Sequence, residues 1–277
     1  MMDLDLPAPP DAAPSMPLGR VIRAIFAVFG LAVRQALRGR RLIFLMALFT
    51  LPAVLAGVER WYDPGASWEE GERVLLFAMI PHALVPLTAL LFACGMIQDE
   101  QEDQTLTYLM VRPVPRWGIY VAKLAAALVI TATLTAVFTI LTEAAVFWDR
   151  SDPWIDRALK ASAASVLSLL SYLSIFGCLS LWTRKSLVIG VSYIVLFEGV
   201  FANIDFLVRQ FTVVWYFRVI CARWIDVDLS DYNIDLTTSP TTLECVQNLG
   251  LAIAVGVVIA LASFNGREFR VKTPEGN

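Results

Sequence analysis

The sequence predicts an all-α membrane protein with six transmembrane helices. Its 277 residues are 57% hydrophobic and 17% charged, whereas soluble domains average about 45–50% apolar and about 25% charged residues. The apolar residues gather in long runs, and a helix needs roughly 20 of them to cross a bilayer core about 30 Å thick. Six runs meet or approach this length, and none has the period-2 alternation that is typical of a membrane β-barrel.

The N-terminal region precedes the first of these runs. Residues 1–17 are rich in proline and are expected to be disordered. Residues 18–40 read LGRVIRAIFAVFGLAVRQALRGR, with arginines toward both ends and apolar residues on the other face. This pattern predicts a basic amphipathic helix in the membrane interface within residues 18–41. The alternative is a simple extension of the first span.

The predicted transmembrane domain covers residues 42–264, and a cytoplasmic tail covers residues 265–277. The first span is short and contains Pro52, while the second contains Pro81 and Pro86, which remove backbone donors and are expected to kink it. The third span is long enough to tilt or to extend beyond the bilayer. The six spans are approximately residues 42–58, 74–97, 119–148, 161–182, 187–208 and 246–264.

Lysines and arginines near the helix ends predict the topology, because cytoplasmic segments carry an excess of them. Six arginines precede the first span and three basic residues follow the last one, whereas residues 59–73 combine two arginines with five acids. Both termini are therefore expected in the cytoplasm, and a five-span alternative is rejected because it leaves the basic tail outside. This topology places residues 99–116 and 184–185 inside, and residues 59–73, 149–160 and 209–244 outside.

The segment between the fifth and sixth spans is rich in aromatic residues, which favour the boundary between membrane and water. We expect short helices that dip into the outer leaflet near residues 211–224, followed by a polar loop. The aromatic residues are Trp215, Tyr216, Phe217, Trp224 and Tyr232.

The four cysteines fall into two pairs. Cys94 and Cys178 lie inside predicted spans, where buried thiols are ordinary core residues. Cys221 and Cys245 lie in the outer segment, which is oxidising in a bacterium, so they are candidates for a disulfide; two free thiols are the alternative. No metal site is expected, because the chain has one histidine and no zinc-binding spacing.

The connection between the second and third spans has an ordered pattern, DEQEDQTLTYLMVRPVPRW over residues 99–117. Leu106, Leu109 and Met110 would share one face of a helix. The acids before them suit a helix N-terminus, and Pro113 and Pro115 would end the helix. The pattern predicts a short amphipathic helix at the cytoplasmic surface, and the alternative is a solvated loop with ordinary caps.

Residues 100–123 resemble the cytoplasmic loop of ABC-2 type transporter permeases, which are membrane subunits of ATP-driven exporters. That family has two acids spaced by one residue, then Gly-Thr-Leu, a leucine ladder, Pro-Val-Ser-Arg, and Gly-Lys at the start of the next span. The chain departs from the pattern at Gln104, Pro115 and Ala122. The matching residues are Glu100, Glu102, Thr105, Leu106, Leu109, Met110, Pro113, Val114, Arg116 and Lys123.

The resemblance implies a permease subunit that pairs with itself or a similar subunit in the bacterial cytoplasmic membrane and in contact with its lipid. It also implies a separate cytosolic ATPase that binds ATP and Mg, so this chain would bind no cofactor, would not be an enzyme and would not bind nucleic acid. The exported substrate is not identified. The residues expected to couple to the ATPase are Glu100, Glu102, Thr105, Leu106, Leu109 and Arg116.

Three ionisable residues inside the predicted spans are candidates for a transport path, because such groups are costly in a bilayer. Glu198 is the strongest candidate, and His82 could be its partner. For His82 the alternative is a hydrogen bond to a kinked backbone, and for Glu143 it is a position at the interface.

Two other functions compete with transport. One is a membrane anchor that recruits a soluble complex through residues 99–116. The other is an intramembrane hydrolase that uses Glu143, Glu198 or His82, although no nucleophile and base occur at a recognisable spacing. A phosphate-binding loop is missing as well, because Lys185 and Ser186 lack the preceding glycines.

Overall fold

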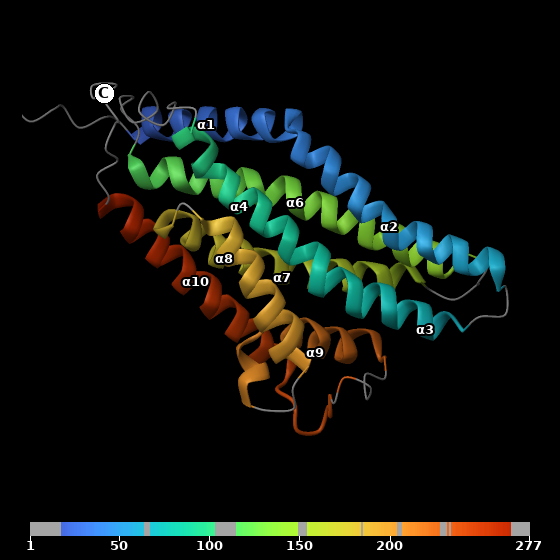
Figure 1. Cartoon of the computed structure of the whole chain (residues 1–277). Coiled ribbons are helices and arrows are strands. Elements are labelled where there is room, and N and C mark those ends of the chain that lie inside the picture. The colour runs from blue at the N-terminus through green and yellow to red at the C-terminus, as the bar shows by residue number, and fades with distance from the viewer. Residues whose placement is uncertain are drawn as a thin grey trace, which may run out of the picture.

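A computed structural model describes residues 18–63, 67–102, 115–148, 154–183, 185–203, 207–227, 232 and 234–266. These residues form helices and turns, without a strand (Figure 1). The predicted disorder of residues 1–17, the short helix around Leu106–Met110 and most of the tail after residue 264 lie outside the described residues.

Six helical segments are long and apolar enough to cross a membrane, which confirms the predicted number of spans. Their ends differ from those expected: the fourth begins at Trp154 and the fifth ends at Asn203. The fourth span begins early because α7 continues into polar residues such as Asp156, which hydropathy alone excludes. The fifth ends where the described residues stop, before residue 204. The six segments are Arg40–Tyr62 (α2), Glu70–Met96 (α3, η1 and α4), Arg116–Val146 (α6), Trp154–Trp182 (α7), Ser186–Asn203 (α8, η2 and η3) and Thr242–Gly266 (α10).

Helix α1 (Leu18–Arg38) is separate from α2 (Arg40–Tyr62). Gly39 between them has extended backbone angles, φ −70° and ψ 137°, and the chain changes direction there (Figure 1). The alternative that α1 merely extends the first span is therefore wrong. Val28 of α1 packs against Ile119 and Ala122 of α6 (Arg116–Val146). Whether α1 lies at the membrane surface stays a prediction.

The second span contains a π-helix, η1 (Arg73–Leu84), followed by α4 (Val85–Glu102). Pro81 lies inside η1 and has no N–H, and the Val85 N–H bonds the carbonyl of Ile80, five residues earlier. The predicted kink is thus a widened helical turn. The fifth span widens in the same way, from α8 (Ser186–Tyr193) into η2 (Ile194–Val200) and the 3₁₀ turn η3 (Phe201–Asn203).

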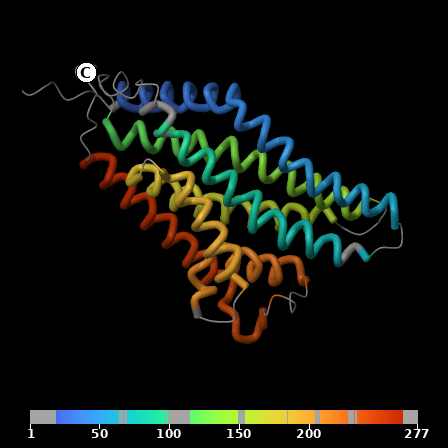
Figure 2. The backbone as a smooth tube through the Cα atoms, in the orientation of Figure 1, coloured from blue at the N-terminus to red at the C-terminus, as the bar shows by residue number. Residues whose placement is uncertain are grey.

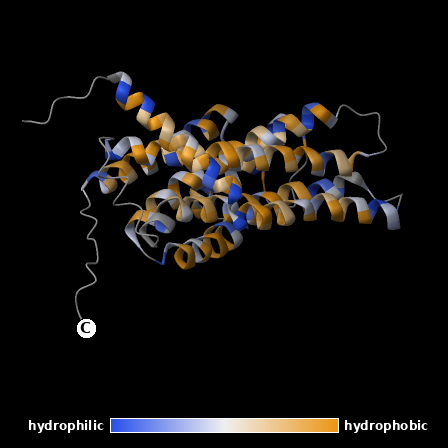
Figure 3. Cartoon of the chain, turned by 90° about the horizontal axis from the view of Figure 1, so that it is seen from above, coloured by the Kyte–Doolittle hydropathy of each residue, from blue (hydrophilic) through white to orange (hydrophobic). Residues whose placement is uncertain are grey.

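The long helices α6 and α7 (Trp154–Trp182) form the centre of the bundle, with α4 and α10 (Thr242–Gly266) packed against α7. Figure 2 shows α10 returning along the bundle so that its C-terminal end lies near the start of α6. The first, fifth and sixth spans are only 22%, 22% and 17% buried, so they leave broad apolar faces. In Figure 3, hydrophobic residues predominate along the helices, and hydrophilic ones lie at several helix ends and at a few positions within the bundle.

Between the fifth and sixth spans the chain forms the 3₁₀ turn η4 (Leu207–Phe211) and helix α9 (Val213–Ile225). Helix α9 packs against α7 and α10 and contributes Trp215, Phe217 and Val219 to the main core. Short helices occur where the aromatic segment predicted them. Their depth in a membrane stays a prediction.

At Gly256, α10 lies close to the backbone of α7. A Cβ atom there would lie 3.1 Å from Ser174 Cβ and 3.2 Å from the Ser174 carbonyl carbon and oxygen, which belong to the backbone and cannot move aside. We expect Gly256→Val to lower the free energy of unfolding by about 1–3 kcal/mol, as overpacking does, and thermal unfolding of the purified chain in detergent measures it. The matched control is Gly250→Val on the same helix, because nothing lies within 4 Å of a Cβ there. Equal loss in both variants would contradict close packing at Gly256.

Candidate functional site

Arg218 of α9 lies at the centre of a polar cluster, which we call the Arg218 cluster: His82, Asn203, Arg218 and Tyr232. Arg218 is 1% exposed. Its Nη2 lies 3.2 Å from His82 Nε2, and its Nη1 donates to Asn203 Oδ1 over 3.0 Å. The guanidinium carbon lies 3.8 Å from the centre of the Tyr232 ring. The second span, the fifth span, α9 and the following loop therefore meet at one cation.

The tautomer of His82 follows from these contacts. His82 Nδ1 lies 3.1 Å from the carbonyl oxygen of Ala78, one helical turn earlier, so Nδ1 carries the proton and donates it. Nε2 then accepts from Arg218. His82 therefore bonds the backbone near the predicted kink, as one alternative expected. It also accepts a hydrogen bond from Arg218, which that alternative did not include.

The charge of Arg218 persists in this environment. Burial lowers the pKa of Arg218 to about 10, while Tyr232, Glu198 and Tyr172 act in the opposite direction. The guanidinium group is therefore a cation at neutral pH, and the face of the Tyr232 ring lies against it.

Glu198, in the π-helix η2, is fully buried. Its carboxyl oxygens accept hydrogen bonds from the backbone N–H groups of Val213, over 3.2 Å, and Val214, over 3.1 Å. The Tyr193 hydroxyl donates to Oε1 over 3.3 Å. Glu198 thus caps the N-terminus of α9, where an acidic group suits the exposed N–H groups. Thr212, the N-cap residue itself, makes no side-chain cap bond. The suggested pairing of Glu198 with His82 is replaced by these contacts.

We expect Glu198→Gln to lower the free energy of unfolding by about 1 kcal/mol, as loss of a helix cap does. An amide oxygen can accept from one of the two N–H groups, but the amide nitrogen then opposes the other. Thermal unfolding of the purified variant measures this, with Glu244→Gln at the start of α10 as an exposed control, where Glu244 accepts from the Thr241 N–H over 2.7 Å. Unchanged stability with loss of transport would instead make Glu198 a residue of the path.

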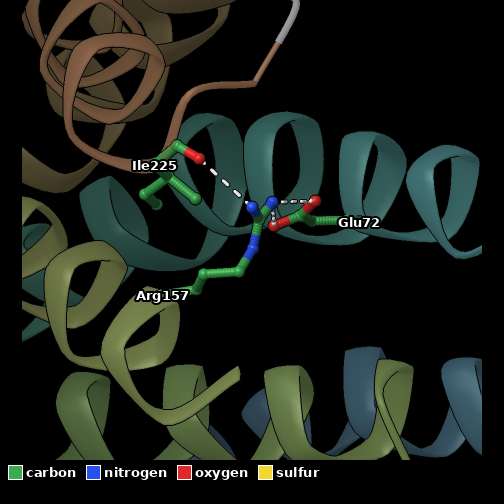
Figure 4. A network of polar contacts seen from close by, with 3 residues as sticks. All are labelled: Glu72, Arg157 and Ile225. Carbon is green, nitrogen blue, oxygen red and sulfur yellow. Dashed lines mark hydrogen bonds and ion pairs between the residues drawn. The ribbon is translucent and has the colours of Figure 1, made fainter. Parts of the chain in front are cut away.

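A second polar cluster joins the second and fourth spans to α9 (Figure 4). Arg157 Nη2 donates to both carboxyl oxygens of Glu72 over 2.7 and 2.8 Å, and Nη1 donates to the Ile225 carbonyl oxygen over 3.1 Å. Glu72 is 1% exposed, and the Arg157 guanidinium lies 5.6 Å from the Phe147 ring centre. The Glu72–Arg157 pair thus lies at the C-terminal end of α9 and holds the second and fourth spans together there.

Glu143 of α6 lies close enough to Glu72 and Arg157 to interact with them electrostatically. It is 1% exposed, and neither of its carboxyl oxygens has a hydrogen-bond partner among the described residues. Glu143 is therefore buried within the bundle, close to the end of α6 at Val146, and its depth relative to the membrane interface stays a prediction.

At the opposite ends of the spans, polar contacts connect α4 to its neighbours. Gln98 donates to the Thr183 carbonyl oxygen over 2.9 Å and to the Ser186 hydroxyl over 2.8 Å. Lys123 of α6 is 5% exposed and donates to the Met96 carbonyl oxygen over 2.6 Å. The end of the second span is thus fixed to the third span and to the start of the fifth.

The predicted coupling residues flank this region. Helix α4 continues through Glu100 and ends at Glu102, and Arg116 begins α6, where its Nη1 donates to the Asn265 carbonyl oxygen over 3.3 Å. Arg116 therefore contacts the end of α10. Thr105, Leu106 and Leu109 lie outside the described residues.

The sequence model of a protein family, described as ABC-2 family transporter protein, matches residues 26–212, which is more than half of the 277 residues. The chain belongs to the ABC-2 transporter family. No curated protein matches it. This ABC-2 permease is thus the membrane-spanning subunit of an ABC transporter, in a family whose ATPase is a separate subunit.

The matched region of the permease contains His82, Glu143 and Glu198 but stops before α9. Arg218 therefore lies beyond it. Sequence reasoning did not identify Arg218, although an arginine inside the apolar stretch VVWYFRVICARWI was a usable signal. Sequence reasoning also assigned Glu72 and Arg157 to outer loops. It did not recognise them as a pair, because they are 85 positions apart in sequence.

All four cysteines of the permease are free thiols in the structure. Cys221 in α9 and Cys245 in α10 are both fully buried, and the structure does not contain the disulfide considered for them. Among the described residues, no group of three His, Cys, Asp or Glu side chains is placed to hold a metal ion.

Proposed function

We propose that the chain is the permease subunit of an exporter, which pairs with a second copy or a similar subunit and binds two copies of a cytosolic ATPase. ATP and Mg bind to the ATPase, and the permease supplies the path for a substrate that is still to be identified. The protein spans the bacterial cytoplasmic membrane with both termini in the cytoplasm, and α1 lies at the cytoplasmic surface.

The observation that carries this proposal is the set of contacts around the ends of α4 and α6. Residues 103–114, which include the predicted coupling residues Thr105, Leu106 and Leu109, connect Glu102 to the start of α6. On either side of this connection, Gln98, Lys123 and Arg116 bind neighbouring helices. A push on that connection therefore acts at once on the second, third, fifth and sixth spans.

The two polar clusters at the opposite end of the bundle are where such a movement would break contacts between spans. Arg218 joins the second span to the fifth, and Arg157 joins the second to the fourth. Each consists of hydrogen bonds that need close alignment, so sliding of one span against another breaks them. The candidate path residues His82 and Glu198 lie where these spans meet α9.

Replacement of Leu109 by aspartate tests the docking role of the connection. The permease and the ATPase proposed as its partner are co-expressed, and we expect Leu109→Asp to abolish co-purification, because a carboxylate replaces an apolar anchor. Leu236→Asp in the outer segment is the matched control, since Leu236 is already 36% exposed, and it should keep the ATPase bound.

Glu102→Ala should weaken coupling, whereas Arg116→Ala should uncouple ATP hydrolysis from transport with the complex intact.

Normal ATPase binding and export in Leu109→Asp would show that the connection is only a linker. An anchor without transport would bind the ATPase without stimulating ATP hydrolysis in reconstituted vesicles. That outcome would favour the rival function of recruiting a soluble complex.

A further inference from the structure

Four arginines of α1 fall on one side of the helix. Arg20, Arg23, Arg34 and Arg38 are separated by 3, 11 and 4 residues, and at about 3.6 residues per turn these spacings place them within about 60° of one another. All four are exposed. We call this set the arginine stripe.

The rest of α1 presents two further sides. Val28 and its neighbour Ile25 pack on α6, where the missing side chain of Gly118 lets Ile25 approach to 3.0 Å of a Cβ position. A second side is apolar yet exposed: Ile22, Phe26 and Leu37 are 45%, 69% and 56% exposed. Helix α1 therefore has a protein side, an exposed apolar side and the arginine stripe, with the apolar side between the other two.

The charge of this region is one-sided. Residues 18–58 contain six arginines, of which Arg40 and Arg41 begin α2, and no Asp, Glu or Lys. A guanidinium group offers a planar fork of donors that matches phosphate oxygens in pairs, which an ammonium group cannot do. Any anionic partner of the stripe therefore comes from outside this stretch, and phosphate is the chemistry that fits it best.

The exposed apolar side decides between sources of phosphate. A free phosphate ion or a nucleic acid would satisfy the guanidinium groups and leave Ile22, Phe26 and Leu37 in water. A phospholipid layer supplies both, because acyl chains lie directly beneath the phosphate groups.

We propose that the arginine stripe binds the phosphate groups of anionic phospholipids in the leaflet in which α1 lies. The inference rests on the surface position of α1 given under the proposed function. It adds a lipid class and the residues that select it. Because α1 packs on the first half of α6, lipid bound to the stripe holds the start of the third span at a fixed depth.

Lipid selectivity of the full-length chain tests the proposal. The chain is reconstituted in phosphatidylcholine vesicles with a trace of spin-labelled phosphatidylglycerol or phosphatidylcholine, and electron paramagnetic resonance gives the relative association constant of the two lipids. We expect the wild-type chain to prefer phosphatidylglycerol about threefold at low salt. The variant R20Q/R23Q/R34Q/R38Q should lose this preference, and R20K/R23K/R34K/R38K should keep part of it because charge remains but the paired bonds do not.

The matched control is R60Q/K160Q/K185Q/R209Q, which removes the same charge from other elements and should keep the preference. No preference in the wild-type chain, or equal loss in the control, overturns the proposal. If the glutamine variant does not fold, the salt dependence decides: a preference unchanged between about 0.05 and about 1 M NaCl also overturns it.

One further outcome separates lipid from protein. If the glutamine variant keeps its lipid preference but no longer co-purifies with the ATPase, the stripe is a protein-docking surface and the proposal is wrong. The lipid measurement contains no ATPase and no transported substrate, so its result is independent of whether the chain is an exporter.

Discussion

Replacement of Arg157 by alanine is expected to lower the free energy of unfolding by about 3–5 kcal/mol, because it leaves a buried charge without its partner. Glu72 is 1% exposed and receives two hydrogen bonds from Arg157, and Glu143 lies nearby with a second carboxyl group. Thermal or denaturant-induced unfolding of the purified variant in detergent measures the loss.

Two comparisons show whether the buried pair is the cause. Lys160→Ala, on the same helix, removes an exposed pair with Asp156 whose side chains are 40% and 65% exposed, and the expected change is about 0.5 kcal/mol or less. Glu72→Gln combined with Arg157→Ala should be more stable than Arg157→Ala alone, because the unpaired carboxylate is gone. If the double variant is no more stable than the single one, Arg157 acts mainly through the Ile225 carbonyl and the Phe147 ring.

Replacement of Arg218 by alanine should cost about 2–4 kcal/mol of unfolding free energy. The change leaves a cavity between three elements and removes the donors that serve His82 Nε2 and Asn203 Oδ1. Thermal unfolding again measures it. Arg218→Lys should recover only part of the loss, because one ammonium group cannot reach these acceptors with the geometry of the guanidinium fork.

The control for Arg218 is Arg209→Ala. Arg209 is half-buried near the start of α9 and lies 5.7 Å from the Trp215 ring centre, so its loss should cost about 1 kcal/mol or less. Equal stability of the Arg209 and Arg218 variants would mean that the Arg218 cluster contributes little to the fold.

The spans could be predicted from the sequence because length and hydropathy are local properties, and the helix break at Gly39 fell close to the predicted boundary of α1. The π-helix around Pro81 could be expected only as a kink, since the register that a helix adopts around a proline depends on its neighbours. Helix ends were misplaced where polar residues such as Asp156 continue a helix beyond its apolar run.

The polar clusters could not be predicted because their members are far apart in sequence. Glu198 accepts hydrogen bonds from residues 15 and 16 positions later, while His82 and Arg218 are 136 positions apart. Candidate path residues were recognised individually by the cost of a polar group in a bilayer. Which groups neutralise or cap them depends on how α9 packs, and one sequence carries no signal for that.

The position of α9 near the end of the chain has a consequence for biogenesis. Synthesis proceeds from the N-terminus, so His82 and Glu198 are both made before any residue of α9. Until α9 arrives, Glu198 lacks the N–H groups of Val213 and Val214, and His82 lacks Arg218. A nascent chain that ends just before α9 would carry five complete spans with these groups unsatisfied at one end. Completion of α9 is thus the step at which Glu198 and His82 of the newly inserted bundle acquire these partners.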